Sequence, residues 1–224
     1  SGNELSLDLA DYVNYLAEDE STRVIALFIE GIRRPQAFMA AAAKALAAGK
    51  PIVAMKTGKS QKARDCALSH TGAIAGDYAA YTAMCERYGI VTCATLDDMV
   101  ELLLVFQAGR LPKGPRVGWV TTSGGTVDLL YDYIEEMGGI ATPEFDAATK
   151  AKLRPLISSE LALKNPLDAG NPAGDDGDAA MCIAVAADPN VDMLAWGGTP
   201  PSGRRVRDPA AMKRVTAATD KPVV

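Results

Sequence analysis

The stretch RVIALFIEGIRRPQAFMAAAAKALAAGKPIVAM, residues 23–55, contains a strand, a helix and a second strand in immediate succession. Its first seven residues, Arg23–Ile29, form an apolar, β-branched run of strand length. Pro35 stands where the first turn of a helix tolerates proline, and an alanine-rich segment continues to Gly49, which predicts a helix between them. Pro51–Met55 predicts a second buried strand. Buried strands joined by a helix are typical of parallel pairing in α/β proteins.

The same alternation continues on both sides of this stretch. Before it, apolar residues between Leu5 and Leu16 recur on one helical face. After it, Asp77 is a candidate N-cap for a helix that ends at Gly89, and residues 90–92 form a short apolar run. Thr95–Asp98 resembles a capping box at the start of a further amphipathic helix.

A linker is predicted at Gly109–Gly114, where Gly, Pro and Lys occur together. The pattern then restarts with a strand at Arg116–Thr121, a tight turn at Ser123–Gly125 and a helix from Val127 to Met137. Further on we expect helices at 145–154 and 178–187, a strand at 191–196, a helix from 208 onward, and mostly irregular chain at 156–174. The sequence therefore predicts an α/β protein with two parallel-sheet domains, residues 1–110 and 114–224.

The two predicted domains also echo each other at a separation of about 170 residues. The matching positions are Asp19 with Asp188, Val24–Leu27 with Val191–Leu194, and Lys50-Pro51 with Lys221-Pro222. This separation is wider than one domain. We therefore expect the first domain to be truncated at its N-terminus, lacking the counterpart of residues 116–137, and the second domain to be truncated at its C-terminus.

Composition excludes several classes of protein. The net charge is −5 and the basic residues are scattered, which argues against a nucleic-acid-binding surface. No apolar run reaches the length of a membrane span. The acidic run 175–178 lacks the spacing of a metal site. The cysteines form no C-x-x-C pair, so we expect reduced thiols in a cytoplasmic protein without a structural metal; these cysteines are Cys66, Cys85, Cys93 and Cys182.

The segment Ser69–Gly76, SHTGAIAG, is the most informative for chemistry. It holds the only histidine of the chain, His70, between small residues and just ahead of a predicted helix. Gly72 lets the backbone turn sharply and lets a ligand approach closely. Backbone N–H groups at a helix start attract anions, and a neutral imidazole beside them can accept a phosphoryl group. The alternative is that His70 is a structural or surface residue.

Two further positions are candidates for a site. Glu30 follows a predicted buried strand, where α/β folds place functional groups, although a solvated residue at a strand exit would have the same position. Ser123-Gly124-Gly125-Thr126 opens a predicted helix, and its backbone N–H groups could hold a phosphate. The alternative for this segment is a plain connection between a strand and a helix.

The segment SHTGAIAG resembles the phosphohistidine loop of the ADP-forming acetyl-CoA synthetases and of succinyl-CoA synthetase, which are NDP-forming acyl-CoA synthetases. The resemblance covers essentially the whole chain. The other motifs in the family's order are Gly2-Asn3, Asp8, Asp19, Thr22–Ile25, Glu30-Gly31, Lys50–Val53, Lys56–Gly58, Asp97 and Glu101-Leu102 in the first half, and Val120–Gly125 and Asn165–Asp168 in the second.

The resemblance implies two flavodoxin-like domains, the second related to the C-terminal domain of the succinyl-CoA synthetase β-subunit. It implies that His70 is the phosphorylated residue and that Glu30 bonds to and orients its imidazole. It also implies that Gly72 and the Ser123–Thr126 helix start bind phosphate. The chain departs from the family at Arg64–Cys66, where small residues are frequent.

The activity implied is that of an acid–CoA ligase (ADP-forming), which interconverts acyl-CoA, phosphate and ADP with carboxylate, CoA and ATP. ATP or ADP with Mg²⁺, and CoA, would be substrates held mainly by a CoA-binding domain and an ATP-grasp domain, on the same polypeptide or on a partner subunit. We expect this chain to be inactive alone and homo-oligomeric when full length. The alternative function is a non-catalytic or regulatory relative that keeps the fold as a binding module.

Overall fold

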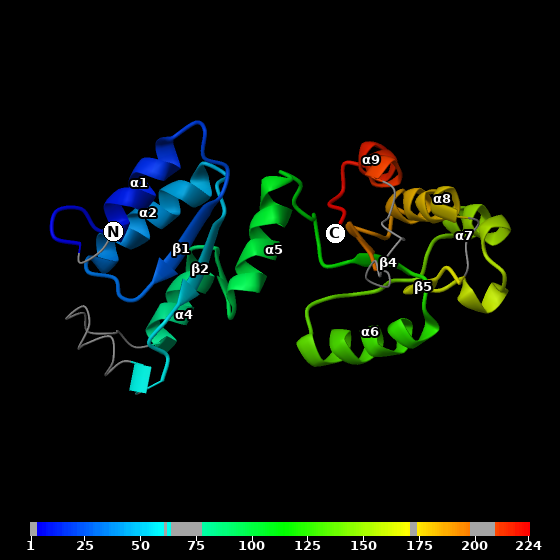
Figure 1. Ribbon diagram of the computed structural model, residues 1–224, viewed down its shortest axis with the longest axis horizontal. Helices are drawn as coiled ribbons and strands as arrows, with labels where there is room; N and C mark the ends of the chain where they lie inside the picture. The colour runs from blue at the N-terminus through cyan, green and yellow to red at the C-terminus, as the bar shows by residue number, and fades with distance from the viewer. Residues whose placement is uncertain (1–3, 61, 64–77, 171–173, 198–208) are drawn as a thin grey trace. The chain divides into compact units, whose positions relative to one another are not determined.

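The computed structural model describes residues 4–60, 62–63, 78–170, 174–197 and 209–224 of the chain. It divides into two compact units, Ser1–Gly109 and Arg110–Val224. Each unit has its own three-stranded parallel sheet, and helices accompany both sheets (Figure 1). Two separate parallel sheets confirm the predicted α/β class.

The first unit has the sheet order β1-β2-β3, with every neighbouring pair parallel. Its register joins Ile25 to Ile52 at one end of the β1–β2 pair and Ile29 to Lys56 at the other. The elements are α1 (Leu9–Glu18), β1 (Ile25–Ile29), α2 (Pro35–Ala47), β2 (Ile52–Lys56), α4 (Tyr78–Arg87), β3 (Ile90–Cys93) and α5 (Leu96–Gln107).

Side chains alternate between the two faces of this first sheet, and a separate core lies on each. One core joins Ile25, Leu27 and Ile29 of β1 to α1, α2 and α4. The other joins Val53 and Met55 of β2 to α5. β2 is the central strand of this sheet, and all five of its residues are buried. Its nearly continuous apolar sequence is typical of a strand covered on both faces.

A polar cluster fastens α1 to α2. Asp8 is the N-cap of α1 and forms a capping box with Asp11. Arg34, the N-cap residue of α2, donates from Nε to Asp8 Oδ2 at 2.5 Å and from an η nitrogen to Oδ1 at 2.7 Å. The hydrogen bond from Arg34 is the largest influence on this carboxyl and lowers the pKa of Asp8 to about 2.

The second unit has the sheet order β5-β4-β6, again parallel throughout. In Figure 1, α6 and α8 lie on opposite sides of β4. The elements are β4 (Val117–Thr121), α6 (Gly124–Met137), α7 (Ala147–Leu153), the short 3₁₀ helices η1 (Arg154–Leu156) and η2 (Glu160–Ala162), β5 (Leu167–Asp168), α8 (Gly174–Ala186), β6 (Met193–Trp196) and α9 (Pro209–Ala217).

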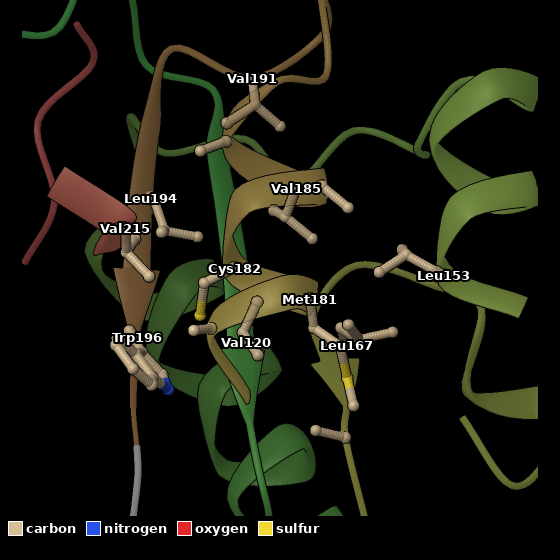
Figure 2. Close-up of a cluster of buried hydrophobic side chains, with 14 of the residues drawn as sticks. Val120, Leu153, Leu167, Met181, Cys182, Val185, Val191, Leu194, Trp196 and Val215 are labelled. Carbon is tan, nitrogen blue, oxygen red and sulfur yellow. The ribbon is translucent and has the colours of Figure 1, made fainter. Parts of the chain in front are cut away.

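The core of the second unit lies between the sheet and helices α8 and α9. Figure 2 shows side chains from β4, β6 and α8 meeting in this layer. Gly118 permits the close approach of β4 to α8, because a Cβ at this position would lie 2.5 Å from Val185 Cγ1. The ten residues labelled in the figure are Val120, Leu153, Leu167, Met181, Cys182, Val185, Val191, Leu194, Trp196 and Val215.

The structure corrects three local expectations. Helix α1 begins only at Leu9, after the Asp8 cap, and Leu5 lies outside it and is exposed. Ser123–Gly125 is not a free-standing turn, because Ser123 is an N-cap and the two glycines form the first turn of α6. The interval expected to be irregular contains the strand β5, which is too short to leave a periodic pattern.

The sequence echo between the halves has a structural counterpart at the amino ends of the sheets. Lys50 donates from Nζ to the main-chain oxygen of Asp19 at 2.6 Å. Lys221 donates from Nζ to the main-chain oxygen of Asp188, also at 2.6 Å. Lys50 precedes β2, and Lys221 precedes Val223, which forms an isolated bridge to β6; each lysine holds the chain that leads into the neighbouring strand.

Candidate functional site

The carboxyl edge of the first sheet carries two charged residues on neighbouring strands. Glu30 directly follows β1 and is exposed, whereas Lys56 is the last residue of β2 and only 7% exposed. Since Ile29 is the register partner of Lys56, the two charged residues lie at the same edge. This is the edge at which parallel α/β sheets bind ligands.

Lys56 is held by main-chain oxygens on both strand ends. Its Nζ donates to the oxygen of Glu30 at 2.8 Å and to the oxygen of Thr57 at 2.5 Å. Burial lowers the pKa of the Lys56 ammonium, and the negative charge of Glu30 acts in the opposite direction. The edge therefore holds a desolvated positive charge close enough to Glu30 to interact with it.

His70 and Gly72 lie outside the described residues. Their relation to Glu30 stays a prediction from the sequence. What the structure supplies on this side is the carboxylate at the strand end and the buried lysine. Sequence reasoning included Lys56 in a matching motif but gave it no role; the signal was a charged residue at the end of an otherwise apolar strand.

The second unit offers a helix start at the carboxyl end of β4. Ser123 caps α6, its Oγ accepting from the N–H of Thr126 at 3.4 Å. Gly124 and Gly125 form the exposed first turn. The first N–H groups of a helix have no partner within the helix, so this turn presents donors and the positive end of the helix dipole. The Thr126 N–H is already bonded to Ser123, so the donors that this turn can offer are those of the two exposed glycines.

Asp168 lies beside this helix start. It ends β5, and its register partner is Thr121 at the end of β4. Gly124 allows the close approach, because a Cβ there would lie 3.1 Å from Asp168 Oδ2. Asp168 Oδ1 accepts from the N–H of Gly170 at 2.9 Å. The sequence motif contained Asp168, but only the folded chain brings it to α6.

Asn165 fixes the segment that leads to Asp168. Its amide nitrogen donates to the main-chain oxygens of Val117 at 2.7 Å and of Pro143 at 3.0 Å, and its Oδ1 accepts from the N–H of Trp119 at 2.9 Å. Asn165 is buried, so these bonds satisfy its amide inside the protein. Within the motif Asn165–Asp168, Asn165 thus holds the main chain in place, and Asp168 supplies a carboxylate near the start of α6.

Two general features limit the chemistry of the described ranges. No group of three or more His, Cys, Asp or Glu residues is arranged there to hold a metal ion. No helix in those ranges has the length and apolarity needed to cross a membrane. Each unit by itself thus carries one candidate: a carboxylate and a lysine at the sheet edge of the first unit, and a capped helix start in the second.

Comparison with known proteins gives a consistent result. Residues 1–106 match the model of the succinyl-CoA ligase like flavodoxin domain. Over 75% of this chain, it is 38% identical to a trans-feruloyl-CoA synthase of unknown prokaryotic origin. Over 86% of this chain, it is 35% identical to the alpha subunit of acetate–CoA ligase [ADP-forming] II of Pyrococcus furiosus.

The solved structures match over nearly the whole chain. The dinucleotide forming acetyl-coenzyme A synthetase 1 of Ca. Korarchaeum cryptofilum, in complex with phosphate and ADP, superposes with a TM-score of 0.85 at 26% identity and covers 99% of this chain. This match confirms that the two sheets are those of flavodoxin-like domains. The chain spans 48% of that structure, 42% of the Pyrococcus subunit and 24% of the feruloyl-CoA synthase.

Proposed function

We propose that this chain, which is similar to NDP-forming acyl-CoA synthetases, carries the phosphoryl group in an acid–CoA ligase that forms ADP. Phosphate attacks the thioester carbonyl of acyl-CoA, the C–S bond breaks, and CoA leaves as acyl phosphate forms. His70 then takes the phosphoryl group and releases the carboxylate. Finally ADP attacks the phosphohistidine and ATP leaves.

His70 supplies the nucleophile in this proposal. A neutral ring nitrogen forms the N–P bond while the P–O bond to the acyl oxygen breaks. Glu30 accepts a hydrogen bond from the other ring nitrogen, which fixes the tautomer and the orientation of the ring. Gly72 leaves room for the phosphoryl oxygens to approach the backbone.

The observation that carries the proposal is the exposed first turn of α6. Ser123 caps it, and Gly124 and Gly125 add no side chain that would keep a phosphate from the backbone N–H groups. A phosphoryl group at this turn would gain about 1 kcal/mol from the helix dipole, in addition to its hydrogen bonds. Ser123–Thr126 is therefore assigned to phosphate binding.

The chain spans less than half the length of these relatives, which supports the proposal that further domains or subunits bind the other substrates. CoA and ATP or ADP with Mg²⁺ would bind mainly to a CoA-binding domain and an ATP-grasp domain, on the same polypeptide or on a partner subunit. The Pyrococcus relative is itself an alpha subunit, which is consistent with such a division. We propose that this chain is inactive alone and that the full protein is a cytoplasmic homo-oligomer.

Labelling of the full-length protein with ATP tests the phosphohistidine. The wild type should take up one acid-labile phosphoryl group, and His70→Asn should lose both the label and the consumption of CoA that depends on the carboxylic acid substrate. Glu30→Gln should slow labelling without eliminating it, since the nucleophile remains. Normal turnover by His70→Asn would refute the mechanism. A folded wild type that takes no label would instead support a non-catalytic or regulatory relative.

The acid substrate is identified by a separate assay. Relatives of this chain include ligases for acetate and a synthase for feruloyl-CoA. Full-length protein should be assayed for ATP-dependent consumption of CoA with acetate, branched acids, aromatic acids and hydroxycinnamates. The acid with the highest kcat/KM is the substrate, and adding it together with CoA should discharge the label from the protein, because its carboxylate accepts the phosphoryl group.

A further inference from the structure

Lys56 is the only basic residue that is buried in the described part of the chain. It ends a strand, β2, whose five residues are all buried. Taking an ammonium out of water costs several kcal/mol unless charged partners compensate. Its Nζ donates hydrogen bonds to two uncharged main-chain oxygens, of Glu30 and Thr57. If Lys56 served only to hold the strand ends together, its desolvation would destabilise the folded state without a compensating charged partner.

At the amino end of the same strand, Lys50 also holds two segments of the chain together, but with less burial of its side chain. Lys50 donates from Nζ to the main-chain oxygens of Leu16 at 3.1 Å and Asp19 at 2.6 Å, and it is only partly buried. A lysine can thus join two segments of this unit while keeping part of its hydration. The full burial of Lys56 needs a further explanation, and Glu30 is the charged residue that it joins directly through the main chain.

We propose that Lys56 is a positioning residue for Glu30, holding its main chain against the end of β2 and placing a positive charge near its carboxylate. The proposal rests on the proposed function, in which Glu30 orients the phosphorylated histidine. The hydrogen bond to the Glu30 oxygen fixes the backbone from which the carboxylate extends. The ammonium also places a positive charge near the Glu30 side chain, and the two charges interact.

A double-mutant cycle in the full-length protein tests this role. Lys56→Met removes the charge and the donors at similar volume. We expect labelling by ATP to slow by about tenfold, as for the loss of an orienting group, with unchanged KM for the nucleotide. Because Lys56 acts through Glu30, the double variant Lys56→Met/Glu30→Gln should be no slower than the slower single variant.

Lys50→Met is the matched control, since it removes a lysine with the same kind of bonds at the opposite end of the same strand. It should lower thermal stability while leaving the labelling rate unchanged. If Lys56→Met does not fold, Lys56→Gln, which retains donors for the main-chain oxygens, replaces it in the cycle.

Two results would overturn the assignment of Lys56. One is an unchanged labelling rate in the folded Lys56 variant. The other is multiplication of the two single-variant losses in the double variant, which would mean that Lys56 and Glu30 act independently. Retention of the label by His70→Asn would refute the proposed function itself, so the two failures are distinguishable.

Discussion

The two sheets differ most at their carboxyl edges. In the first unit, β1 ends in the exposed Glu30, with buried Lys56 on the next strand. In the second unit the echoed strand β6 is followed by Gly197, where a Cβ would lie 3.1 Å from Trp119 Nε1. An alanine at position 197 would therefore already press against the Trp119 ring. The first sheet thus has a carboxylate and a buried lysine at its carboxyl edge, whereas the second has Asp168, a glycine and a capped helix start there, and no lysine ends its described strands.

The amino edges are more alike but not identical. Both units use a lysine bonded to an aspartate main-chain oxygen. The second unit adds an ion pair, in which Arg116 donates to Asp192 Oδ2 at 2.9 Å and to Oδ1 at 2.7 Å. In the first unit, the residue that corresponds to Asp192 in the sequence echo is Ile25, which lies in the hydrophobic core. The shared scaffold therefore carries different electrostatics at both edges.

The largest stability effect is expected at this ion pair. The Asp192 side chain is 7% exposed, and the hydrogen bond from Arg116 lowers its pKa. Asp192→Ala should destabilise the second unit more than the control below, because it removes the acceptor of both the Arg116 guanidinium and the Arg116 main-chain N–H. Both tryptophans, Trp119 and Trp196, lie in this unit, so tryptophan fluorescence during urea unfolding reports it selectively.

The matched control is Glu160→Ala, which breaks a pair with Arg154 whose side chains are 63% and 57% exposed. An exposed pair should contribute less than about 1 kcal/mol. Equal losses for Asp192→Ala and Glu160→Ala would show that burial does not distinguish the two pairs. A matching loss of hydrogen-exchange protection in the first unit would show that the units do not unfold separately.

The second effect belongs to the first unit and depends on pH. The pKa of Asp8 is lowered from 3.8 to about 2, so its contribution is present above the higher value and is lost as the pH falls through the lower one. The shift corresponds to about 2 kcal/mol between neutral pH and pH 2. Hydrogen exchange of α1 should measure this loss.

Asp8→Asn provides the control for the acid effect. Its α1 should be less stable than the wild type at neutral pH, and the difference should shrink as the pH falls toward 2. A difference that stays constant with pH would mean that the Arg34 contact does not depend on the Asp8 charge. Tryptophan fluorescence should be insensitive to this substitution, because both tryptophans belong to the other unit.

The smallest effect compares two helix caps. Thr95 caps α5 and accepts from the N–H of Asp98 at 3.0 Å within a capping box, whereas the Ser123 bond at the start of α6 is longer, at 3.4 Å. Ser123→Ala should cost about 0.5 kcal/mol and Thr95→Ala about 1 kcal/mol. Only Ser123→Ala should also slow labelling by ATP. An equal slowing by both would argue against phosphate binding at α6.

The sequence predicted most elements because their signals are local. The run at β1, the proline and glycine that bound α2, and the capping box at Thr95 act within a few residues. Strand β5 was missed because Leu167–Asp168 is a strand only by virtue of pairing with β4. Helix α1 was predicted to begin too early because Leu5 has the right spacing but precedes the Asp8 cap.

For the site, the sequence alone supplied the candidates that we propose carry chemistry: a single histidine in a glycine-containing loop, a carboxylate after a strand and a serine before two glycines. These depend on residue type and spacing. Only the tertiary structure placed Asp168 beside Gly124, and only it showed that Lys56 is buried against the main chain of Glu30. These contacts join residues that are distant in sequence. The burial of a side chain depends on all the elements that pack around it. No local pattern can specify either.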